Sequence, residues 1–577
     1  MDSDTQELLK TIATKTDETE FYTPIPKGYK LGQTKFIVIF GTVMSGLGKG
    51  IFSASLAKLL QMKGLNIAPI KLEGYLNIDS GTLNPYRHGE VFVLDDGMEC
   101  DMDLGTYERF LNLNLTKSNF TTNGQIFTRI LERERKGGYL GRDVQFIPHV
   151  TGEIKNQLRH LALSSKADVI AIEIGGTVGD IENQHYIEAM RELAYEEGKY
   201  NVCFVALSYV LEPKSLGEQK SKAAQLGIKK LLEQGIQPDI IALRAANKVT
   251  DKVKEKVSMF SNVPLSRVVS MHDVDSVYLI PGLLKEAKID EQVLDILHIN
   301  DNTNYKKKLN PKAEIAEFKK WQEFVDGIKN HKQAITVGIT GKYTSLRDSY
   351  ASIIAALEHA GSKLKADVKI KWIDVEAIET KKTTVKEELK DVSGIIVPGG
   401  FGKRGVEGKI ACIKYVRENN IPYLGLCYGF QMAVIEFARN VCGLKDAHTT
   451  EVETTCKNHV IDILPEQKKI EGLGGNMRLG GREVEIRKNT RAFAIYGNKT
   501  KIKERFRHRY EVNPEFIPLL EKNGMVFSGK HPKYNIMQIL ELPKLKYFLG
   551  CQFHPEFTSR PLTPNPLYLE FVKNCLK

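Results

Sequence analysis

The chain lacks the features that mark membrane proteins, disulfide-rich secreted proteins and zinc proteins. Its 577 residues include eight cysteines, and no two of them form a C-x-x-C pair, so neither a zinc site nor a disulfide framework is predicted. The longest apolar runs, such as 36–40 and 169–172, are far shorter than the ~18 residues that a membrane-spanning helix needs. The first residues are partly acidic and contain no apolar stretch, unlike a leader peptide. We therefore expect a cytoplasmic protein that does not bind membranes.

Internal repeats and low-complexity segments are also missing. The composition, 42% hydrophobic and 27% charged residues, is that of a globular protein, and at ~150 residues per domain the length allows roughly two to four domains. The net charge of +11 is spread along the chain rather than gathered in a tail. We expect this charge to serve small anionic substrates, above all phosphates, rather than nucleic acid.

The pattern of apolar segments predicts two α/β domains, at 34–299 and 334–577. An N-terminal extension at 1–33 precedes the first, and a Lys-rich linker at 300–333 with one amphipathic helix separates the two. In the first domain, buried strands alternate with helices, which indicates a mostly parallel sheet covered on both faces. The expected strands are 36–41, 66–72, 168–174, 202–208 and 239–244, and the expected helices include 52–63, 184–196 and 220–234. In the second domain we expect strands 334–340, 367–373, 393–397 and 422–426, and helices 347–360, 407–419 and 428–440.

A glycine-rich segment joins the first predicted strand to the first predicted helix. It runs from Gly41 to Gly50 as GTVMSGLGKG. Backbone N–H groups and the helix dipole attract phosphate at such a turn, and Lys49 adds a positive charge toward the outer phosphates. We therefore predict an ATP-binding loop. The pattern G-x-x-x-x-G-K-[ST] is not met, because Gly50 stands where a hydroxyl residue would hold Mg²⁺, so carboxylates must hold the metal.

Two acidic segments can supply those carboxylates. One spans residues 95–103, and the other begins at Glu173, which ends an apolar strand. Mg²⁺ in nucleotide sites takes one or two carboxylates together with phosphate oxygens, and ligands bind at the carboxyl ends of parallel strands. We predict that Asp103 and Glu173 hold the metal, and we expect Asp95 and Asp96 to lie in a solvated turn.

The second predicted domain contains a G-x-nucleophile-x-G turn with Cys427 at its centre. Such a turn lifts the nucleophile out of the sheet and directs the next backbone N–H toward a developing oxyanion. The glycine-rich segment 398–402 can supply a second N–H. A later strand leads into His554, which can accept the thiol proton, and Glu556, which can orient the imidazole. We predict these three residues as the catalytic set.

Longer runs of sequence extend these motifs. In the first half they are GxVxSxLGKG at 41–50, GTLNP at 81–85, HGEVFV at 88–93, DMDLG at 101–105, YERF at 107–110 and EIGGTVGDIE at 173–182. In the second half they are PGGFG at 398–402, GLCYG at 425–429, RHRYEVN at 507–513 and HPEFTS at 554–559. Together they resemble the CTP synthases, and the resemblance covers the chain from about residue 35 to its end. It implies a P-loop-type synthase domain followed by a class I glutamine amidotransferase domain of flavodoxin-like fold.

The resemblance implies a reaction and its ligands. The reaction is UTP + ATP + glutamine → CTP + ADP + phosphate + glutamate, through a 4-phosphorylated UTP and ammonia that crosses an internal tunnel. Mg²⁺ is the implied cofactor, GTP the allosteric activator and CTP the feedback inhibitor. The implied assembly is a homotetramer, in which the UTP site spans subunits, and filaments can form from it.

The resemblance also implies the binding residues, position by position. Those for ATP are Ser45, Gly46, Leu47, Gly48, Lys49, Gly50, Lys71, Asp103, Asp273 and Val274. Those for UTP and CTP are Ser45, Asp180, Ile181, Glu182, Lys220, Ser221, Lys222, Gln225 and Lys256. Those for glutamine are Gly400, Tyr428, Gly429, Phe430, Gln431, Glu451 and Arg509. Asp103 and Glu173 are the implied Mg²⁺ ligands.

Three positions depart from the family pattern. The family run KLDPYIN is KLEGYLN at 71–77, KTKPTQ is KSKAAQ at 220–225, and His272 stands where lysine is common. None of these changes removes a catalytic group, but they concern the shape of the loops and the selectivity for nucleotides.

Two other functions remain open at this point. One is a related amidoligase with another acceptor, against which Lys220, Lys222 and Lys256 argue because they suit a triphosphate. The other is a P-loop scaffold or filament protein with a silent second domain, against which the intact set of Cys427, His554 and Glu556 argues.

Overall fold

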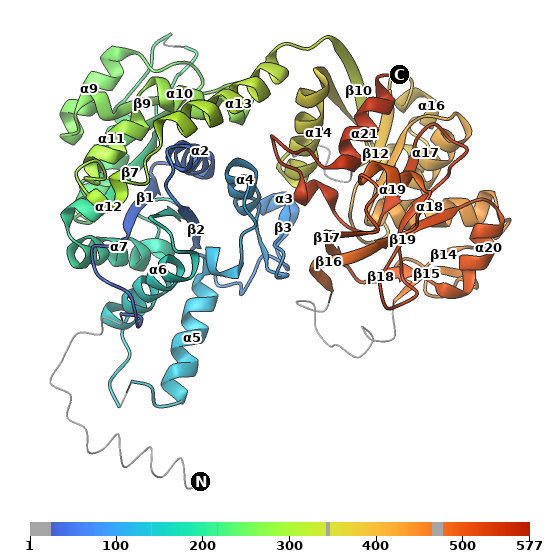
Figure 1. Ribbon diagram of the computed structural model, residues 1–577, viewed down its shortest axis with the longest axis horizontal. Helices are drawn as coiled ribbons and strands as arrows, with labels where there is room; N and C mark the ends of the chain where they lie inside the picture. Colours follow the sequence, from blue (N-terminus) through green and yellow to red (C-terminus); the bar gives the residue numbers. More distant parts are fainter. Residues whose placement is uncertain (1–24, 140, 216, 342–346, 464–476) are drawn as a thin grey trace, which may run out of the picture. The chain divides into compact units, whose positions relative to one another are not determined.

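The computed structural model describes residues 25–139, 141–215, 217–341, 347–463 and 477–577, and the chain divides into two compact units (Figure 1). The first unit comprises the chain up to Asp79 and Thr106–Lys319, and the second comprises Ser80–Gly105 and Lys320–Lys577. Each unit contains its own β-sheet.

The described part of the first unit contains a seven-stranded sheet in which every neighbouring pair of strands is parallel. In spatial order the strands are β5 (Phe120–Thr122), β2 (Ile67–Glu73), β6 (Val169–Ile174), β1 (Lys35–Gly41), β7 (Val202–Tyr209), β8 (Ile240–Ala245) and β9 (Val268–His272). The helices are α2 (Lys49–Met62), α5 (Asn123–Arg135), α6 (Thr151–Ser165), α7 (Gln184–Glu197), α8 (Lys222–Glu233), α9 (Asp251–Ser261), α10 (Ile280–Glu286), α11 (Ile289–Ile296) and α12 (Thr303–Lys306), and α4 (Met102–Leu111) spans the division between the units.

The central strand β1 shows why the strands of this sheet appear as apolar runs in the sequence. All seven of its residues are buried. Phe36, Val38 and Phe40 share one core with Leu158 of α6 and Met190 of α7. Because helices cover both faces of a parallel sheet, its strands need apolar side chains on both sides. The predicted parallel α/β fold of the first half is confirmed.

The second unit contains a nine-stranded mixed sheet among its described residues. Five strands are parallel, in the order β11 (Ala366–Trp372), β10 (Gln333–Ile339), β12 (Gly394–Val397), β13 (Tyr423–Leu426) and β21 (Phe548–Cys551). The sheet continues antiparallel through β20 (Met537–Glu541), β19 (Val526–Lys530), β16 (Arg478–Ile486) and β17 (Lys501–His508). A smaller sheet contains β14 (His448–Thr449), β15 (His459–Ile463) and β18 (Tyr510–Val512). The helices are α13 (Pro311–Lys329, which spans the division), α14 (Ala351–Leu364), α15 (Val375–Glu379), α16 (Val385–Glu388), α17 (Val406–Glu418), α18 (Tyr428–Asn440), α19 (Arg491–Ile495), α20 (Ile517–Lys522) and α21 (Pro566–Cys575).

One segment from the first half of the sequence folds with the second unit. It contains α3 (Pro85–His88) and the antiparallel hairpin of β3 (Val91–Val93) and β4 (Glu99–Asp101). The backbone N–H of Ser352 donates to Glu90, and the Arg507 guanidinium contacts Glu99 at 2.7 Å. Residues 80–105 therefore fold with the second unit rather than with the rest of the domain expected at 34–299. The contacts that hold them there join residues far apart in the sequence.

The same segment corrects the interpretation of Asp95. Its carboxylate lies 2.6 Å from Arg505, whose side chain is fully buried, and 2.8 Å from Lys503. Burial by itself raises the pKa of Asp95, but Arg505 and Lys503 together lower it. Only Asp96 is exposed, as expected for a solvated turn.

The other differences from the expected elements are local. Arg347–Tyr350 form a 3-10 turn, so the helix expected at 347–360 begins at Ala351. The antiparallel strands β16, β17, β19 and β20 were not predicted. Residues 1–24 of the expected extension lie outside the described residues, whereas Tyr29 is buried and donates to Glu197 at 3.1 Å.

Candidate functional site

The predicted nucleophile occupies a strained turn between β13 and α18. Cys427 has φ 49° and ψ −96°, in the positive-φ region that residues with a side chain rarely adopt. Its N–H donates to the Cys551 carbonyl at 2.7 Å, which ties the turn to the neighbouring strand β21. Tyr428 begins α18, so its N–H belongs to the first turn, where helical N–H groups have no acceptor within the helix. The turn therefore combines a nucleophile with an adjacent N–H donor, as the sequence predicts.

The predicted base and its orienting carboxylate follow β21. His554 Nδ1 lies 2.7 Å from Glu556 Oε1, and the imidazole stacks on the Phe557 ring at 4.9 Å. Burial by itself lowers the pKa of His554, but the Glu556 carboxylate and the Cys427 thiol outweigh it and raise the pKa to about 10. The site therefore favours the protonated imidazole, which is the form the ring has after taking the thiol proton.

A glycine loop closes one side of this catalytic set. A Cβ atom at Gly399 would lie 2.8 Å from His554 Cε1 and 3.7 Å from Cys427 Cβ. The loop after β12 therefore touches both the base and the nucleophile, and a side chain at Gly399 would displace the imidazole. Gly399 of the predicted segment 398–402 thus lies near Cys427 and His554, and the second oxyanion contact from this segment stays a prediction.

Two polar contacts to the thiol were not predicted from the sequence. The Gln552 side-chain amide donates to Cys427 Sγ at 3.6 Å, and the thiol donates to the Arg507 carbonyl at 3.5 Å. Gln552 stands two residues before His554, so strand alternation could have suggested that both side chains point to one face.

Several predicted glutamine-binding residues lie around this set. Tyr428 donates to the Gly402 carbonyl at 2.9 Å, and the Gly402 N–H donates to Glu451 at 2.7 Å. Gln431 donates to the Tyr510 carbonyl at 2.8 Å and to Gln552 at 3.2 Å. Of the other predicted residues, Gly429 and Phe430 follow Tyr428 in α18, Gly400 follows Gly399, and Arg509 lies between β17 and β18.

The predicted phosphate loop follows β1 in the first unit. Gly46 and Gly48 have φ of 76° and 81°, which glycine adopts without strain, and Val43 also has a positive φ of 73°. Lys49 begins α2, and its Nζ donates to the Gly176 carbonyl at 2.7 Å. The lysine therefore spans from the loop after β1 to the loop after β6.

Charged side chains gather at the ends of β2 and β6. The two strands pair with Lys71 opposite Glu173. Lys71 Nζ lies 3.1 Å from Glu73 and 3.6 Å from Glu173, and Tyr107 donates to Glu173 at 2.7 Å. Both carboxylates supply the hard oxygen atoms that Mg²⁺ prefers.

The second predicted metal ligand belongs to the other unit. Asp103 lies in the first turn of α4 before the division, and its N–H donates to Asp101 at 3.0 Å. Among the described residues, no group of three or more His, Cys, Asp or Glu side chains is arranged to hold a metal ion. The pairing of Asp103 with Glu173 stays a prediction.

The predicted pyrimidine-binding residues lie in loops and helix starts of the first unit. Asp180 accepts from the Thr177 N–H at 2.9 Å, and Ile181–Asn183 form a 3-10 turn. Lys220 contacts Glu218, whose pKa is lowered chiefly by Lys220 and further by Lys252 and Lys256. Ser221 and Gln225 are joined by a 3.1 Å hydrogen bond at the start of α8, where Lys222 is the first residue.

Many of these predicted residues, but not Asp103 or Lys256, lie near one edge of the first sheet. The segments 42–50, 175–182 and 210–222 follow the carboxyl ends of β1, β6 and β7. Asp273 and Val274 follow β9, and the Asp273 N–H donates to the Ala245 carbonyl at the end of β8. Lys71 and Glu173 complete the edge at β2 and β6. Ligands bind at this edge of open parallel sheets.

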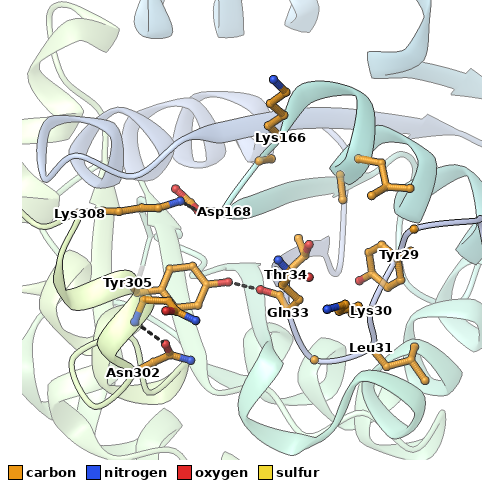
Figure 2. Close-up of a pocket in the computed structure, with 16 residues that line it drawn as sticks. Tyr29, Lys30, Leu31, Gln33, Thr34, Lys166, Asp168, Asn302, Tyr305 and Lys308 are labelled. Atoms are coloured by element: carbon orange, nitrogen blue, oxygen red, sulfur yellow. Dashed lines mark hydrogen bonds and ion pairs between the residues drawn. The ribbon is translucent and has the colours of Figure 1, made fainter.

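A cavity of about 670 Å³ lies at the opposite edge of this sheet (Figure 2). Thr34 and Asp168, which line it, directly precede β1 and β6. Tyr305 points across it and donates to the Gln33 carbonyl, and Lys308 lies 2.5 Å from Asp168. None of the predicted site residues lines this cavity, so it is separate from the predicted nucleotide edge.

Comparisons with known proteins match the two halves of the chain to two families. A family described as "CTP synthase N-terminus" matches residues 35–299, and one described as "Glutamine amidotransferase class-I" matches residues 345–574. The chain is 46% identical to a CTP synthase of Pyrococcus furiosus over 541 residues, which cover 94% of this chain and 97% of the relative. It is 46% identical to a CTP synthase of Staphylococcus saprophyticus over 543 residues, 94% of this chain and 99% of the relative. The solved glutaminase domain of "Trypanosoma brucei CTPS", with bound acivicin, is 36% identical and matches 42% of this chain and 94% of that chain with a TM-score of 0.39.

The fold and the site together define a class of enzyme. A parallel α/β unit with a predicted phosphate loop is joined to a class I glutamine amidotransferase unit with a predicted Cys–His–Glu set, which is the organisation of a glutamine-dependent ligase. Within that class, the chain belongs to the CTP synthase family. None of its described helices combines the length and the apolar character needed to span a membrane.

Proposed function

We propose that the chain converts UTP to CTP, using ATP and ammonia released from glutamine, with ADP, phosphate and glutamate as the other products. The observation that carries this proposal is the presence, on one chain of this family, of an assembled Cys427–His554–Glu556 set and a phosphate loop with Lys49. A phosphate loop alone would suit many ATP-using enzymes, and a glutaminase set alone would suit many amidotransferases.

The second unit releases ammonia by nucleophilic catalysis. His554 accepts the Cys427 proton, and Glu556 stabilises the resulting imidazolium. The thiolate attacks the amide carbon of glutamine, and the N–H of Tyr428, with one from the 398–402 loop, stabilises the oxyanion. His554 then protonates the leaving ammonia, and water hydrolyses the thioester. Gly400, Tyr428, Gly429, Phe430, Gln431, Glu451 and Arg509 bind the glutamine.

The first unit activates UTP. The oxygen at C4 is a poor leaving group until it is phosphorylated by ATP, after which ammonia displaces phosphate. Lys49 and Lys71 offset the charge of the transferred phosphoryl group. Each has an oxygen partner in the structure, a carbonyl for Lys49 and carboxylates for Lys71, so phosphate oxygens replace existing contacts rather than desolvate a free ammonium. Ammonia passes between the units through an internal channel, which prevents its protonation to ammonium in bulk water.

The residues for the nucleotides are assigned by the same proposal. ATP binds through residues 45–50, Lys71, Asp103, Asp273 and Val274. UTP, and CTP as feedback inhibitor, bind through Ser45, residues 180–182, residues 220–222, Gln225 and Lys256. Their support is that residues 45–50, Lys71, Asp273 and Val274 lie at, or just after, the carboxyl ends of β1, β2 and β9, and that residues 180–182 and 220–225 belong to the connections that follow β6 and β7. Lys256 acts on Glu218 together with Lys220.

Mg²⁺ is the proposed cofactor, held by Asp103 and Glu173. Glu173 fits this role because its buried carboxylate, at the end of β6, supplies hard oxygen atoms and already has a tyrosine hydroxyl and a lysine as neighbours. Bound there with nucleotide phosphates, the metal would neutralise phosphate charge during transfer.

Assembly and regulation complete the proposal. Five large apolar side chains around the 180–182 loop and the start of α5 are half or more exposed, namely Leu76, Ile78, Phe146, Ile147 and Ile181. Exposed apolar clusters of this kind mark protein interfaces, which supports a homotetramer in which the pyrimidine site lies near subunit contacts. GTP is the proposed activator of the glutaminase, and the cytoplasm is the proposed location.

The test is to incubate the purified protein with UTP, ATP, Mg²⁺ and GTP, with either glutamine or ammonium at alkaline pH, and to detect CTP by chromatography. We expect CTP from both nitrogen sources. CTP from ammonium alone would refute the proposed glutaminase coupling. CTP from neither source, with ATP hydrolysed on addition of another acceptor, would refute UTP as the substrate.

A further inference from the structure

Two loops of the nucleotide edge are joined by one buried asparagine. Asn123 is the first residue of α5, and it is buried, with 3% of the residue exposed. Its Nδ2 group donates to the Gly74 carbonyl at 2.7 Å and to the Glu182 carbonyl at 2.9 Å. Gly74 directly follows Glu73, the last residue of β2, and Lys71 lies in the same strand. Glu182 belongs to the proposed pyrimidine loop. A single amide therefore links the end of β2 to the loop after β6.

A histidine from α7 fixes the orientation of that amide. His185 Nε2 lies 2.6 Å from Asn123 Oδ1. Because both hydrogens of Nδ2 face carbonyl oxygens, the amide oxygen must face the ring, and His185 donates from Nε2. Burial lowers the pKa of His185 to about 4, so the ring is neutral near pH 7. Every polar atom of the Asn123 side chain is thus engaged, which leaves the amide one orientation.

Small residues let the backbone segments approach each other. A Cβ atom at Gly74 would lie 3.1 Å from Glu182 Cβ and 3.3 Å from Glu182 O. A Cβ atom at Gly124 would lie 2.2 Å from the Leu76 carbonyl oxygen. Gln125 adds a 2.7 Å hydrogen bond from Nε2 to the Ile78 carbonyl. Three successive residues of α5, from Asn123 to Gln125, therefore pack against the 74–78 loop.

The amide of Asn123 is not required to cap the helix. Thr122 is the N-cap residue of α5, and its side chain accepts from the Gln125 N–H at 3.2 Å. Because this helix end has its own cap, the contacts of Asn123 to Gly74 and Glu182 serve the loops rather than the helix.

We propose that Asn123 is a positioning residue for the pyrimidine nucleotide, and that Gly74 and His185 act through it. By fixing the Glu182 backbone against the loop beside Lys71 and Glu73, it holds the proposed pyrimidine loop in the conformation that binds UTP. This proposal rests on the assignment of residues 180–182 to UTP. It also accounts for the glycine in KLEGYLN, because a side chain at position 74 would press on Glu182.

The test compares Asn123→Asp with Asn119→Asp. The aspartate at 123 keeps the shape of the side chain but turns an oxygen toward two carbonyl oxygens. Asn119 is a matched control, because it is also buried and donates to a backbone carbonyl, that of Pro69, at 2.7 Å. Ammonia-dependent CTP synthesis is measured against UTP concentration, glutamine hydrolysis reports on the second unit, and thermal unfolding reports on the fold. Gly74→Ala is a second variant, and Glu182→Gln tests the pyrimidine loop itself.

We expect Asn123→Asp to raise the KM for UTP about tenfold, which corresponds to ~1.4 kcal/mol, with kcat and the KM for glutamine changed less than about twofold. Gly74→Ala raises the same KM, and Asn119→Asp leaves it unchanged. If Asn123→Asp and Asn119→Asp had equal KM values for UTP while Glu182→Gln had a raised KM for UTP, the positioning role of Asn123 would be overturned. The assignment of residues 180–182 to UTP would then still stand. An unchanged KM in Glu182→Gln would overturn the assignment of the pyrimidine loop, and this proposal with it. If Asn123→Asp fails to fold, the KM for UTP of Gly74→Ala is compared with that of Asn119→Asp instead. A raised KM in Gly74→Ala supports the positioning role, and an equal KM overturns it.

Discussion

The two sites of this chain differ in how much of their chemistry is already assembled. In the second unit, the residues proposed as nucleophile, base and orienting carboxylate are buried, the latter two are in contact, and Gly399 lies near the nucleophile and the base. In the first unit, the cationic residues proposed for phosphate are held by other partners, Lys49 by a carbonyl and Lys220 by Glu218.

The chemistry of each site explains this difference. Covalent attack by a thiol needs a base nearby whose ring is oriented by a third group, here the Glu556 carboxylate. Phosphate binding needs backbone N–H groups and mobile cations that can exchange one anionic partner for another. Changes at the site of the second unit should therefore abolish CTP synthesis from glutamine but not from ammonia. Changes at the site of the first unit should weaken CTP synthesis from both nitrogen sources.

The largest effect is expected for Cys427→Ala. We expect glutamine-dependent synthesis to fall by ~10⁴-fold or more, because the nucleophile is lost, while ammonia-dependent synthesis is retained. Parallel assays with glutamine and ammonium measure this. Cys442→Ala, which removes a partly exposed thiol elsewhere in the unit, is the control. Loss of both activities in Cys427→Ala would contradict the separation of the two sites.

Glu556→Gln should act through His554. We expect glutamine hydrolysis to fall roughly 10²- to 10⁴-fold, because the imidazolium loses its orienting charge. The folded-state pKa of His554, about 10, lies above the ordinary value of 6.5. The protonated ring therefore contributes stability that is complete below pH 6.5 and is lost as pH rises through about 10.

The thermal midpoint of the second unit, followed across this pH range in both proteins, checks the sign of that contribution. The difference between wild type and Glu556→Gln should be greatest at pH 6.5 and should shrink toward pH 10. A difference that grows with pH would show that Glu556 does not raise the pKa of His554.

Lys49→Ala should reduce synthesis from either nitrogen source by roughly 10²- to 10³-fold, as expected when one group that stabilises developing charge is removed. Lys30→Ala, at the opposite edge of the same sheet, is the control and should leave both rates unchanged. Ammonia-dependent assays at saturating UTP make the measurement. Retained synthesis would rule out the proposed role of Lys49 in ATP binding.

The smallest effect concerns the hairpin that folds with the second unit. Asp95→Ala leaves the buried Arg505 without its carboxylate, and we expect a loss of about 2 kcal/mol of stability. Asp96→Ala, at the exposed neighbour, should change stability by less than ~0.5 kcal/mol. Chemical unfolding followed by a probe in the second unit measures both. Equal effects would mean that both aspartates lie in a solvated turn after all.

Much of the fold could be predicted because its signals are local. The buried strands of the first unit are apolar runs, and a glycine-rich turn followed by Lys49 marks the start of α2 within a few residues. The elbow at Cys427 and the segment from His554 to Glu556 are also short patterns. Each motif contains enough of the contact geometry to be recognised without its neighbours.

Other features depend on partners far along the chain. The acidic sequence around Asp95 predicts a solvated residue, because its partner Arg505 is 410 positions away in the chain. The contacts of Asn123 with Gly74 and Glu182 bring together segments 49 and 59 positions apart. No local pattern indicates such pairs, since they arise from the order of strands in the sheet.

The sequence by itself determined the two α/β halves, and it predicted the phosphate loop and the three residues proposed for glutamine hydrolysis, because periodicity and short motifs specify local backbone geometry. Only the tertiary structure decided that residues 80–105 fold with the second unit, that Gln552 and Gly399 contact the catalytic residues, and that one asparagine joins two nucleotide loops. These depend on the burial and pairing of polar groups across long sequence separations, which become defined only when the sheets are assembled.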